Sequence, residues 1–379
     1  TQEEADAVSK VLLSNKVNYW TGTECREFEK EFAAFTGTQY AVALSNGTLA
    51  LDVALKAMGM GAGDDIIVTS RTFLASASCI VTAGANPVFA DVDLNSQNIS
   101  AETIKAALTP NTKAIIVVHL AGMPAEMDGI MDLAKEYDLW VIEDCAQAHG
   151  AKYKGKSVGS IGHVGAWSFC QDKIMTTGGE GGMVTTNDKE LWSKMWSYKD
   201  HGKSYDAVYH REHAPGFRWL HESFGTNWRM MEMQAVIGRI QLKRMPEWTA
   251  RRQAHAAKLA ESLGKFASIR LIEVADYIEH AQYKFYAFVK PEHLKDGWTR
   301  DRIVNELNAR KVPCYQGSCS EVYLEKAFDN TPWRPKERLK NAVELGDTSL
   351  MFLVHPTLTD DEIAFCKEHI EAVLAEATA

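Results

Sequence analysis

The sequence lacks the features that mark several classes of protein. Its 379 residues contain no apolar run near the ~18 residues that a membrane-spanning helix needs. The first residues, Thr1 to Glu4, are polar and acidic, unlike a signal peptide. Low-complexity tracts, proline-rich linkers and internal repeats are also missing. We therefore expect a folded cytoplasmic protein that has no membrane partner.

Cysteine and positive charge are both scarce. The chain has 7 cysteines, an odd number, and no CxxC pair, which favours a reduced protein over a disulfide framework or a zinc site. No metal is therefore predicted. The 41 basic residues are outnumbered by 50 acidic ones, giving a net charge of −9. Because neutralising nucleic-acid phosphates requires a basic surface, no nucleic-acid partner is expected, although a single anion can still be held locally.

Short apolar runs alternate with helix-like segments in the first half of the chain. The runs are rich in Val and Ile, as in strands buried on both faces, and span 40–44, 66–69, 88–90, 114–119, 139–142 and 166–169. The helix-like segments are 48–58, 75–84, 101–108 and 127–137. This alternation predicts an α/β fold, with a mostly parallel central sheet wrapped by helices.

The pattern changes near residue 250. A long helical segment, 230–263, contains Pro246, which is expected to kink or break it. Strand-like runs follow at 269–274 and 284–289, and helices at 300–310, 337–345 and 360–375. We therefore predict a large domain over 1–250 and a smaller C-terminal α+β domain over 251–379.

The segment Ser45-Asn46-Gly47-Thr48 follows the first strand directly and opens the next helix. Backbone N–H groups at a helix start, with Ser and Thr hydroxyls, can hold one phosphate without a basic residue. Plain helix capping by Ser45 or Asn46 is the alternative.

Two further candidates lie between Glu143 and Gly182. Asp144 comes just after a buried strand, at the edge where open α/β sheets bind ligands, and its carboxylate could hold a pyridinium or merely cap a turn. Lys173 follows the strand 166–169 and could form a Schiff base or be an ordinary surface lysine. The glycine-rich turn 178–182 permits positive φ and lacks the Walker spacing.

Together these features match the needs of pyridoxal 5′-phosphate (PLP). One phosphate would rest on a helix start, a ring nitrogen would be kept protonated by a strand-end Asp, and a Lys would form an aldimine. The released Lys amine could then move the proton of a substrate Cα. Each feature is weak alone, but their joint occurrence in this order predicts a PLP enzyme.

The motifs that carry these residues resemble those of the DegT/DnrJ/StrS family of sugar aminotransferases, which have the fold-type I aminotransferase architecture and bind PLP. The resemblance covers nearly the whole chain and rests on SNGTLAL, EDCAQAHGA, the lysine segment WSFCQDKIMTTGGEGG and GTNWRM. It implies that Lys173 forms the internal aldimine, that Asp144 pairs with the pyridine nitrogen and that Gln147 bonds the phenolic oxygen.

The resemblance also implies the remaining contacts. Phe73 is similar to the residue that stacks on the ring, and Gly47, Thr48 and Ser168 resemble the phosphate contacts. Asn227 resembles a residue that reaches the phosphate from the neighbouring subunit, which implies an obligate homodimer. His201 and Tyr315 lie in segments that approach the substrate in relatives.

The resemblance implies a transaminase that takes an amino group from glutamate and passes it to a keto-sugar, either nucleotide-linked or a free keto-deoxy sugar acid. The product would be an amino sugar for a polysaccharide, lipopolysaccharide or secondary metabolite. The alternatives are a PLP-dependent sugar dehydratase and a non-catalytic ligand-binding regulator. Lys173 argues against the dehydratase, because some dehydrating relatives carry His there. The absence of a helix-turn-helix segment and of a basic patch argues against the regulator.

Overall fold

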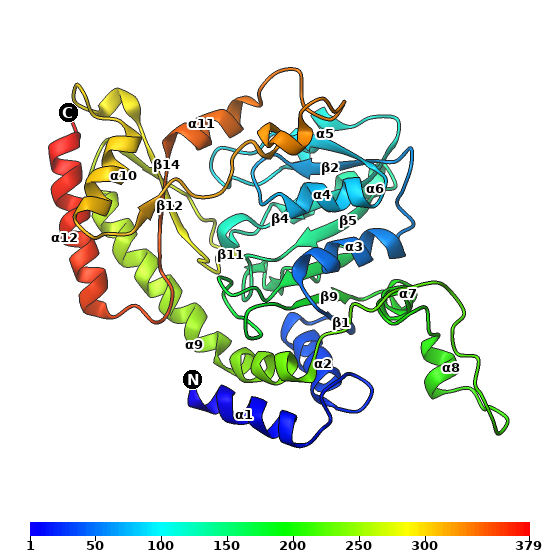
Figure 1. The fold of residues 1–379 in the computed structure, drawn as a ribbon. Helices are drawn as coiled ribbons and strands as arrows, with labels where there is room; N and C mark the ends of the chain where they lie inside the picture. Colours follow the sequence, from blue (N-terminus) through cyan, green and yellow to red (C-terminus); the bar gives the residue numbers. More distant parts are fainter.

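A seven-stranded sheet forms the centre of the computed structural model, which describes all 379 residues (Figure 1). Its strands, in spatial order, are β1 (Tyr40–Leu44), β9 (Gly182–Thr186), β8 (Val164–Ser168), β5 (Trp140–Asp144), β4 (Thr112–Val118), β2 (Asp65–Thr69) and β3 (Asn86–Ala90). Only β9 runs against the others, since it pairs antiparallel with both β1 and β8. The predicted mostly parallel sheet is confirmed.

Helices cover both faces of this sheet. Successive strand residues point to opposite faces, so Ile116 of β4 joins one apolar cluster while Ile115 and Val117 join another. The first cluster includes side chains of α2 (Glu24–Thr36), α3 (Gly47–Ala57), α4 (Ala75–Thr82) and α7 (Lys189–Lys199). The second includes side chains of α5 (Ala101–Ala107) and α6 (Met127–Glu136). Burial on both faces explains why these strands are continuous apolar runs.

A second, antiparallel sheet lies beside the first (Figure 1). Its strands, in spatial order, are β10 (Ile269–Leu271), β12 (Phe285–Val289), β14 (Ser349–Phe352) and β13 (Cys314–Tyr315). A third apolar cluster joins this sheet to α10 (Arg300–Ala309), α12 (Asp360–Ala377) and the last turns of α9 (Glu232–Leu263). This part of the chain also contains α11 (Lys340–Thr348).

Two elements connect the parts. Helix α9 contacts α2 and also α1 (Gln2–Leu13) at one end, and it packs on α12 at the other. It continues through Pro246, where a kink or a break was expected: the helix does not break, and Figure 1 shows it changing direction along its length. A small sheet pairs β6 (Lys152–Tyr153) with β7 (Lys156–Ser157) and with β11 (Ile278–Glu279). A division at residue 250 falls inside α9 and stays a prediction.

The strands and helices expected before residue 170 are confirmed to within two residues at each end. The helices α1 and α2, which precede the first strand, are additional elements. No helix in the structure has the length and apolar character required to cross a bilayer.

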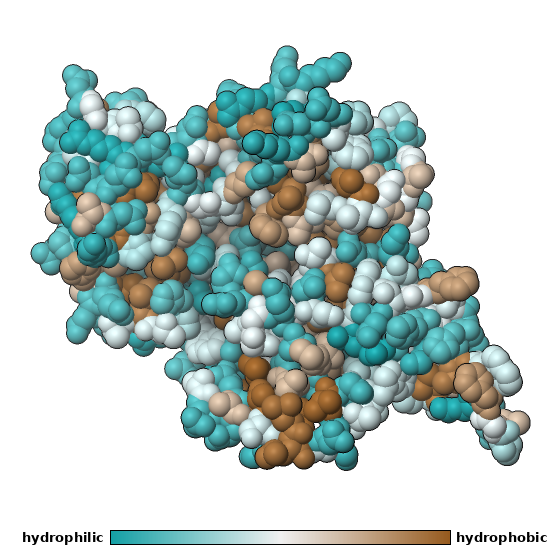
Figure 2. All heavy atoms as spheres, in the orientation of Figure 1, coloured by the Kyte–Doolittle hydropathy of each residue, from teal (hydrophilic) through white to brown (hydrophobic).

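The chain between α7 and α9 projects from the body (Figure 1). This segment, residues 205–226, is called the arm below; it contains α8 (Tyr205–Tyr209) and then a loop. Phe217, Trp219 and Phe224 in the arm are 77%, 80% and 99% exposed. Figure 2 shows apolar residues on the arm and a second apolar patch on the lower surface, and the exposed Leu12 and Leu13 belong to α1. Large apolar side chains exposed in this way are typical of an interaction surface.

A buried ion pair joins α7 to α2 beneath the first strand. The Lys199 ammonium is fully buried and donates to Glu29 Oε1 at 3.1 Å, while the backbone N–H of Ala43 in β1 donates to the same oxygen at 2.9 Å. The Tyr19 hydroxyl donates to Glu29 Oε2 at 3.1 Å, and its ring lies 3.7 Å from the Lys199 ammonium. One carboxylate therefore holds two helices, a strand and the N-terminal loop together.

We predict that Lys199→Met destabilises the protein by about 3 kcal/mol, because it leaves the Glu29 carboxylate, which is only 12% exposed, without its counter-charge. The matched control is Lys194→Met on the same helix, whose exposed pair with Glu190 should contribute less than about 1 kcal/mol. Urea denaturation of both variants measures the difference. Equal midpoints for the two variants would show that the buried pair does not stabilise the fold.

Candidate functional site

A cavity of about 1200 Å³ opens at the carboxyl ends of β5 and β8, between the two parts of the chain. The second part of the chain, which is built around the antiparallel sheet, completes the wall of the cavity with Tyr283, Lys284, Tyr315 and Met351. Eight of the ten candidate residues line it: Gly47, Thr48, Phe73, Asp144, Gln147, Ser168, Lys173 and Tyr315. The fold therefore brings together residues that are up to 268 positions apart in the sequence (Gly47 to Tyr315).

Asp144 is the last residue of β5, and its side chain is buried at the base of the cavity. Ser76, in the first turn of α4, donates its hydroxyl to Oδ2 at 2.7 Å, and the N–H of Ala146 donates to Oδ1 at 3.1 Å. Burial raises the pKa of Asp144, although both hydrogen bonds lower it. A positive charge placed beside the carboxylate would keep it ionised, because opposite charge favours the charged form.

Gln147 lies one turn after Asp144, and its orientation is set by a backbone contact. The N–H of Ala121 donates to its Oε1 at 2.8 Å, so Oε1 is the end that is engaged. Ala121 has a left-handed φ of 57°, which directs this N–H. The Gln147 NH₂ group, which makes no hydrogen bond within the chain, is left as a donor in the cavity wall.

The start of α3 provides an open set of N–H groups. Asn46 is the N-cap, and its side chain accepts from the N–H of Leu49 at 3.0 Å, which leaves those of Gly47 and Thr48 unpaired. A Cβ at residue 47 would lie 2.5 Å from Ser168 Cβ, so this close approach requires glycine. Unpaired N–H groups at a helix start, with two hydroxyls nearby, favour an anion such as a phosphate.

The glycine-rich turn after Lys173 supports the same region. Gly178 and Gly179 have φ values of 84° and 123°, which confirms the expected positive φ. At its end, Gly182 passes so close to the start of α3 that a Cβ there would lie 2.2 Å from the Asn46 carbonyl oxygen. The turn therefore packs β9 against the start of α3.

Lys173 extends into the cavity beside Asp172. Its Nζ lies 3.6 Å from Asp172 Oδ1 and 5.3 Å from the centre of the Tyr283 ring. The Tyr283 hydroxyl donates to Asp172 Oδ2 at 2.6 Å. Burial raises the pKa of Asp172, but the Tyr283 hydrogen bond and the Lys173 charge outweigh it and leave the pKa below its ordinary value. Asp172 thus keeps a negative charge beside the lysine.

Phe73 and Tyr315 stand at the more open part of the cavity. Phe73 precedes α4 and is 71% exposed, which is unusual for a large apolar ring and suits one that covers a ligand. Tyr315 in β13 is also exposed and reaches the cavity from the second sheet.

Asn227 and His201 lie elsewhere. Both are exposed, and neither lines the cavity. Their backbones are neighbours, because Asp200 and Asn227 form an isolated antiparallel β-bridge and the N–H of His201 donates to the Thr226 carbonyl. They flank the two ends of the arm. The backbone next to Asn227 contacts the residue before the N-cap of α3, because the N–H of Ser45 donates to the Trp228 carbonyl at 3.1 Å.

Several side chains of the site carried no sequence signal of their own. Ser76 was one small residue among several in a helix, and Tyr283 and Lys284 began an ordinary apolar run. The run begins with a tyrosine and a lysine, in YKFYAFV, and this is the only local signal of a functional role. A lysine is rarely found in a strand that is buried along its length.

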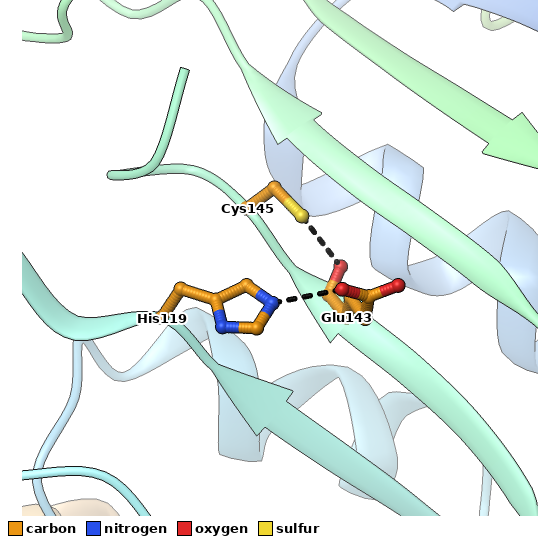
Figure 3. Close-up of side chains that lie close together, drawn as sticks. All are labelled: His119, Glu143 and Cys145. Atoms are coloured by element: carbon orange, nitrogen blue, oxygen red, sulfur yellow. Dashed lines mark hydrogen bonds and ion pairs between the residues drawn. The ribbon is translucent and has the colours of Figure 1, made fainter. Parts of the chain in front are cut away.

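Figure 3 shows a second cluster beside the site, formed by His119, Glu143 and Cys145, which are close enough for metal binding. Their donor atoms are already engaged. His119 Nε2 donates to Glu143 Oε2 at 2.9 Å, and its Nδ1 accepts from the N–H of Ala125. Glu143 also accepts backbone N–H groups from the loop before β8, namely those of Gly159, Ile161 and Gly162.

The thiol of Cys145 points to the backbone carbonyl of Glu143, and burial raises its pKa well above the ordinary value. A metal ligand must be a thiolate. The cluster is therefore a saturated hydrogen-bond network that fixes the ends of the strands, and its donor set does not fit a metal ion.

Comparison with known proteins agrees with the geometry of the cavity. The model of the DegT/DnrJ/EryC1/StrS aminotransferase family matches residues 1–371. The GDP-perosamine synthase of Escherichia coli O157:H7 is 41% identical over 374 residues, 98% of this chain and 95% of that protein. The UDP-N-acetyl-3-dehydro-alpha-D-glucosamine 3-aminotransferase of Acidithiobacillus ferrooxidans is 41% identical over 363 residues, 94% of this chain and 90% of that protein.

A solved structure extends this comparison. The aminotransferase from Psychrobacter cryohalolentis is 64% identical, with a TM-score of 0.97, and the match covers 99% of this chain and 97% of that one. The expected architecture, a fold-type I aminotransferase, is confirmed by this likeness together with the sheet order.

We predict that Gly47→Ala weakens the binding of PLP about 10- to 100-fold, because the added Cβ displaces Ser168 or the start of α3 and misplaces N–H groups that would hold a charged phosphate. Titration of the apoprotein with PLP, followed by absorbance, measures the dissociation constant. The matched control is Gly61→Ala, where the nearest atom to a Cβ is 3.9 Å away. The phosphate assignment is wrong if the two variants bind PLP equally well.

Proposed function

The chain belongs to the DegT/DnrJ/EryC1/StrS aminotransferase family, and from this premise we propose the substrates, cofactor contacts and assembly with which it acts. It is a sugar aminotransferase of amino-sugar biosynthesis, as its relatives are. We propose that the amino donor is glutamate and that the acceptor is a nucleotide-linked keto-sugar. Relatives named for GDP- and UDP-linked sugars support this acceptor, and so does a cavity larger than most small-molecule sites.

The cofactor that the family implies is PLP, and the cavity fits it. One observation carries this proposal: a lysine amine, a buried strand-end carboxylate and an open helix start line a single cavity. Gly47, Thr48 and Ser168 would hold the phosphate, Phe73 would cover the ring and Gln147 would donate to its phenolic oxygen. When bound, PLP supplies an electron sink for the negative charge left when a proton leaves the carbon that bears the amine.

Side chains of the protein would control the protonation of the cofactor ring and transfer the substrate proton. Asp144, held by Ser76 and Ala146, would keep the ring nitrogen protonated, because its carboxylate is stabilised by the positive charge it faces. The Lys173 amine would anchor the cofactor aldehyde and, once released, carry a proton at Nζ to and from the substrate. Asp172 would keep that amine oriented, since Tyr283 fixes the carboxylate from its other side.

We propose that the protein acts as a homodimer in which Asn227 reaches the phosphate in the cavity of the other subunit. Asn227 and His201 lie outside the cavity of their own chain, and both flank the arm with its exposed aromatic residues. The hydrogen bond from Ser45 to Trp228 would then join the phosphate-binding segment of one subunit to the residue that serves the other. The same exchange would bring His201 to the partner's substrate.

The first test is the visible spectrum of the purified protein with PLP, before and after addition of glutamate. We expect a band that bleaches with glutamate, and we expect Lys173→Ala to lose the glutamate response and about 10²- to 10⁴-fold or more of the transaminase activity. Lys105→Ala, at an exposed lysine of α5, is the control. Full activity in Lys173→Ala would overturn the role of this lysine. A band that persists would point to another donor or to a dehydratase, and no band at all would point to a ligand-binding regulator.

The second test is complementation between two inactive variants. When Lys173→Ala and Asn227→Ala chains are co-expressed, a mixed dimer would contain one cavity with both native residues, so about a quarter of the native activity should return. Each variant alone should stay inactive. The control pairs Lys173→Ala with the double variant, which can form no native cavity. If Asn227 served its own subunit, the mixture would show no recovery.

A further inference from the structure

The cavity contains a second amine that the assignments above leave unused. Lys284 stands just before β12, is half-buried and lines the cavity. Its Nζ lies 4.9 Å from the centre of the Tyr283 ring, and Lys173 Nζ lies 5.3 Å from the same centre. Both distances are within the range of a cation–π contact. The two ammonium groups are therefore gathered around one aromatic ring.

The charge of Lys284 is not neutralised within the chain. Asp172, the acidic group shared by the two lysines, is engaged by Lys173 and by the Tyr283 hydroxyl. The Lys284 ammonium group makes no ion pair and no hydrogen bond within the chain. Burial lowers the pKa of Lys284, and the nearby Arg252 and Lys173 lower it further, whereas Asp172 raises it. An anion bound beside Lys284 would relieve this excess of positive charge.

The backbone that carries Lys284 is held firmly. The buried Arg252 guanidinium donates to the carbonyl oxygens of Gln282 and Tyr283 at 3.4 and 3.3 Å. The N–H of Tyr283 donates to the Ala121 carbonyl at 2.9 Å, and the N–H of Ala121 in turn donates to Gln147. Lys284 is thus positioned by the same network that orients a proposed cofactor contact, which suits a preorganised binding group.

We propose that Lys284 binds the carboxylate of the amino donor; this rests on the proposed function. In an amino acid the α-carboxylate is attached to the carbon whose amine reacts next to Lys173, so it must be placed close to that lysine. Lys284 shares the Tyr283 ring with Lys173 and is the cation that remains when the Lys173 amine is occupied. A nucleotide-linked keto-sugar carries its negative charge on the diphosphate and has no charge next to its reacting carbonyl.

The test compares Lys284→Met with Lys290→Met, a control at the opposite end of β12 that is outside the cavity. Binding of glutarate to the PLP-loaded protein, measured by calorimetry, should be about 10- to 100-fold weaker in Lys284→Met, which is the range for losing a hydrogen bond to a charged group. The glutamate concentration that half-bleaches the visible band should rise similarly. Lys284→Arg should retain binding to within several-fold, and an unchanged visible band shows that each variant is folded.

Measuring the reaction with the keto-sugar acceptor distinguishes a role of Lys284 in binding the amino donor from a role in binding an acidic sugar. The Lys284→Met protein, once its cofactor carries the amine, should be half-saturated by the same keto-sugar concentration as the native protein. Unchanged glutarate and glutamate affinities would overturn the proposal, and so would a loss confined to the keto-sugar step. A native protein whose band ignores glutamate would contradict the proposed donor instead, and the glutarate comparison would still test Lys284.

Discussion

The carboxyl edge of the central sheet depends on one buried carboxylate. Glu143 accepts four hydrogen bonds, one from His119 at the end of β4 and three from the loop that leads into β8. Burial raises its pKa, but these donors outweigh burial and bring the pKa below its ordinary value. A permanent negative charge inside the protein is stable only because every lone pair has a donor. The carboxyl ends of β4 and β5 and the start of β8 are thereby held together.

Asp144, the next residue, uses the same strand for a different purpose. Successive side chains of a strand point to opposite faces, so Glu143 faces the closed network and Asp144 faces the cavity. Asp144 has only two hydrogen bonds, and burial raises its pKa. One carboxylate is thus saturated and structural, while its neighbour remains able to meet a cation. The contrast in hydrogen bonding explains why the His119, Glu143 and Cys145 cluster, although conspicuous, leaves no carboxylate oxygen free to meet a cation.

The second part of the chain supplies what the sheet edge cannot. The sheet edge contributes Asp144, Ser168 and the start of α3, which suit a flat aromatic ring with one phosphate. Tyr283, Lys284 and Tyr315 come from the second part and line the cavity as well. The interactions that place them are made across the boundary between the parts, such as the bond from Tyr283 to Asp172. This wall of the cavity therefore depends on how the two parts pack against each other.

The family resemblance alone implied Phe73, Gln147, Ser168 and Tyr315 of the cavity. Local patterns in the sequence were sufficient to predict the strands and helices of the first half, the positive φ in the glycine-rich turn, and Gly47, Thr48, Asp144 and Lys173 as candidate site residues. They were sufficient because a strand buried on both faces needs a continuous apolar run, and because a polar residue just after such a run lies at the sheet edge. Only the tertiary structure decided which distant segments meet. Ser76 contacts Asp144 from 68 positions away and Tyr283 contacts Asp172 from 111, while Asn227 and His201 lie outside the cavity of their own chain. Such contacts follow from the packing of whole elements, which no short stretch of sequence specifies.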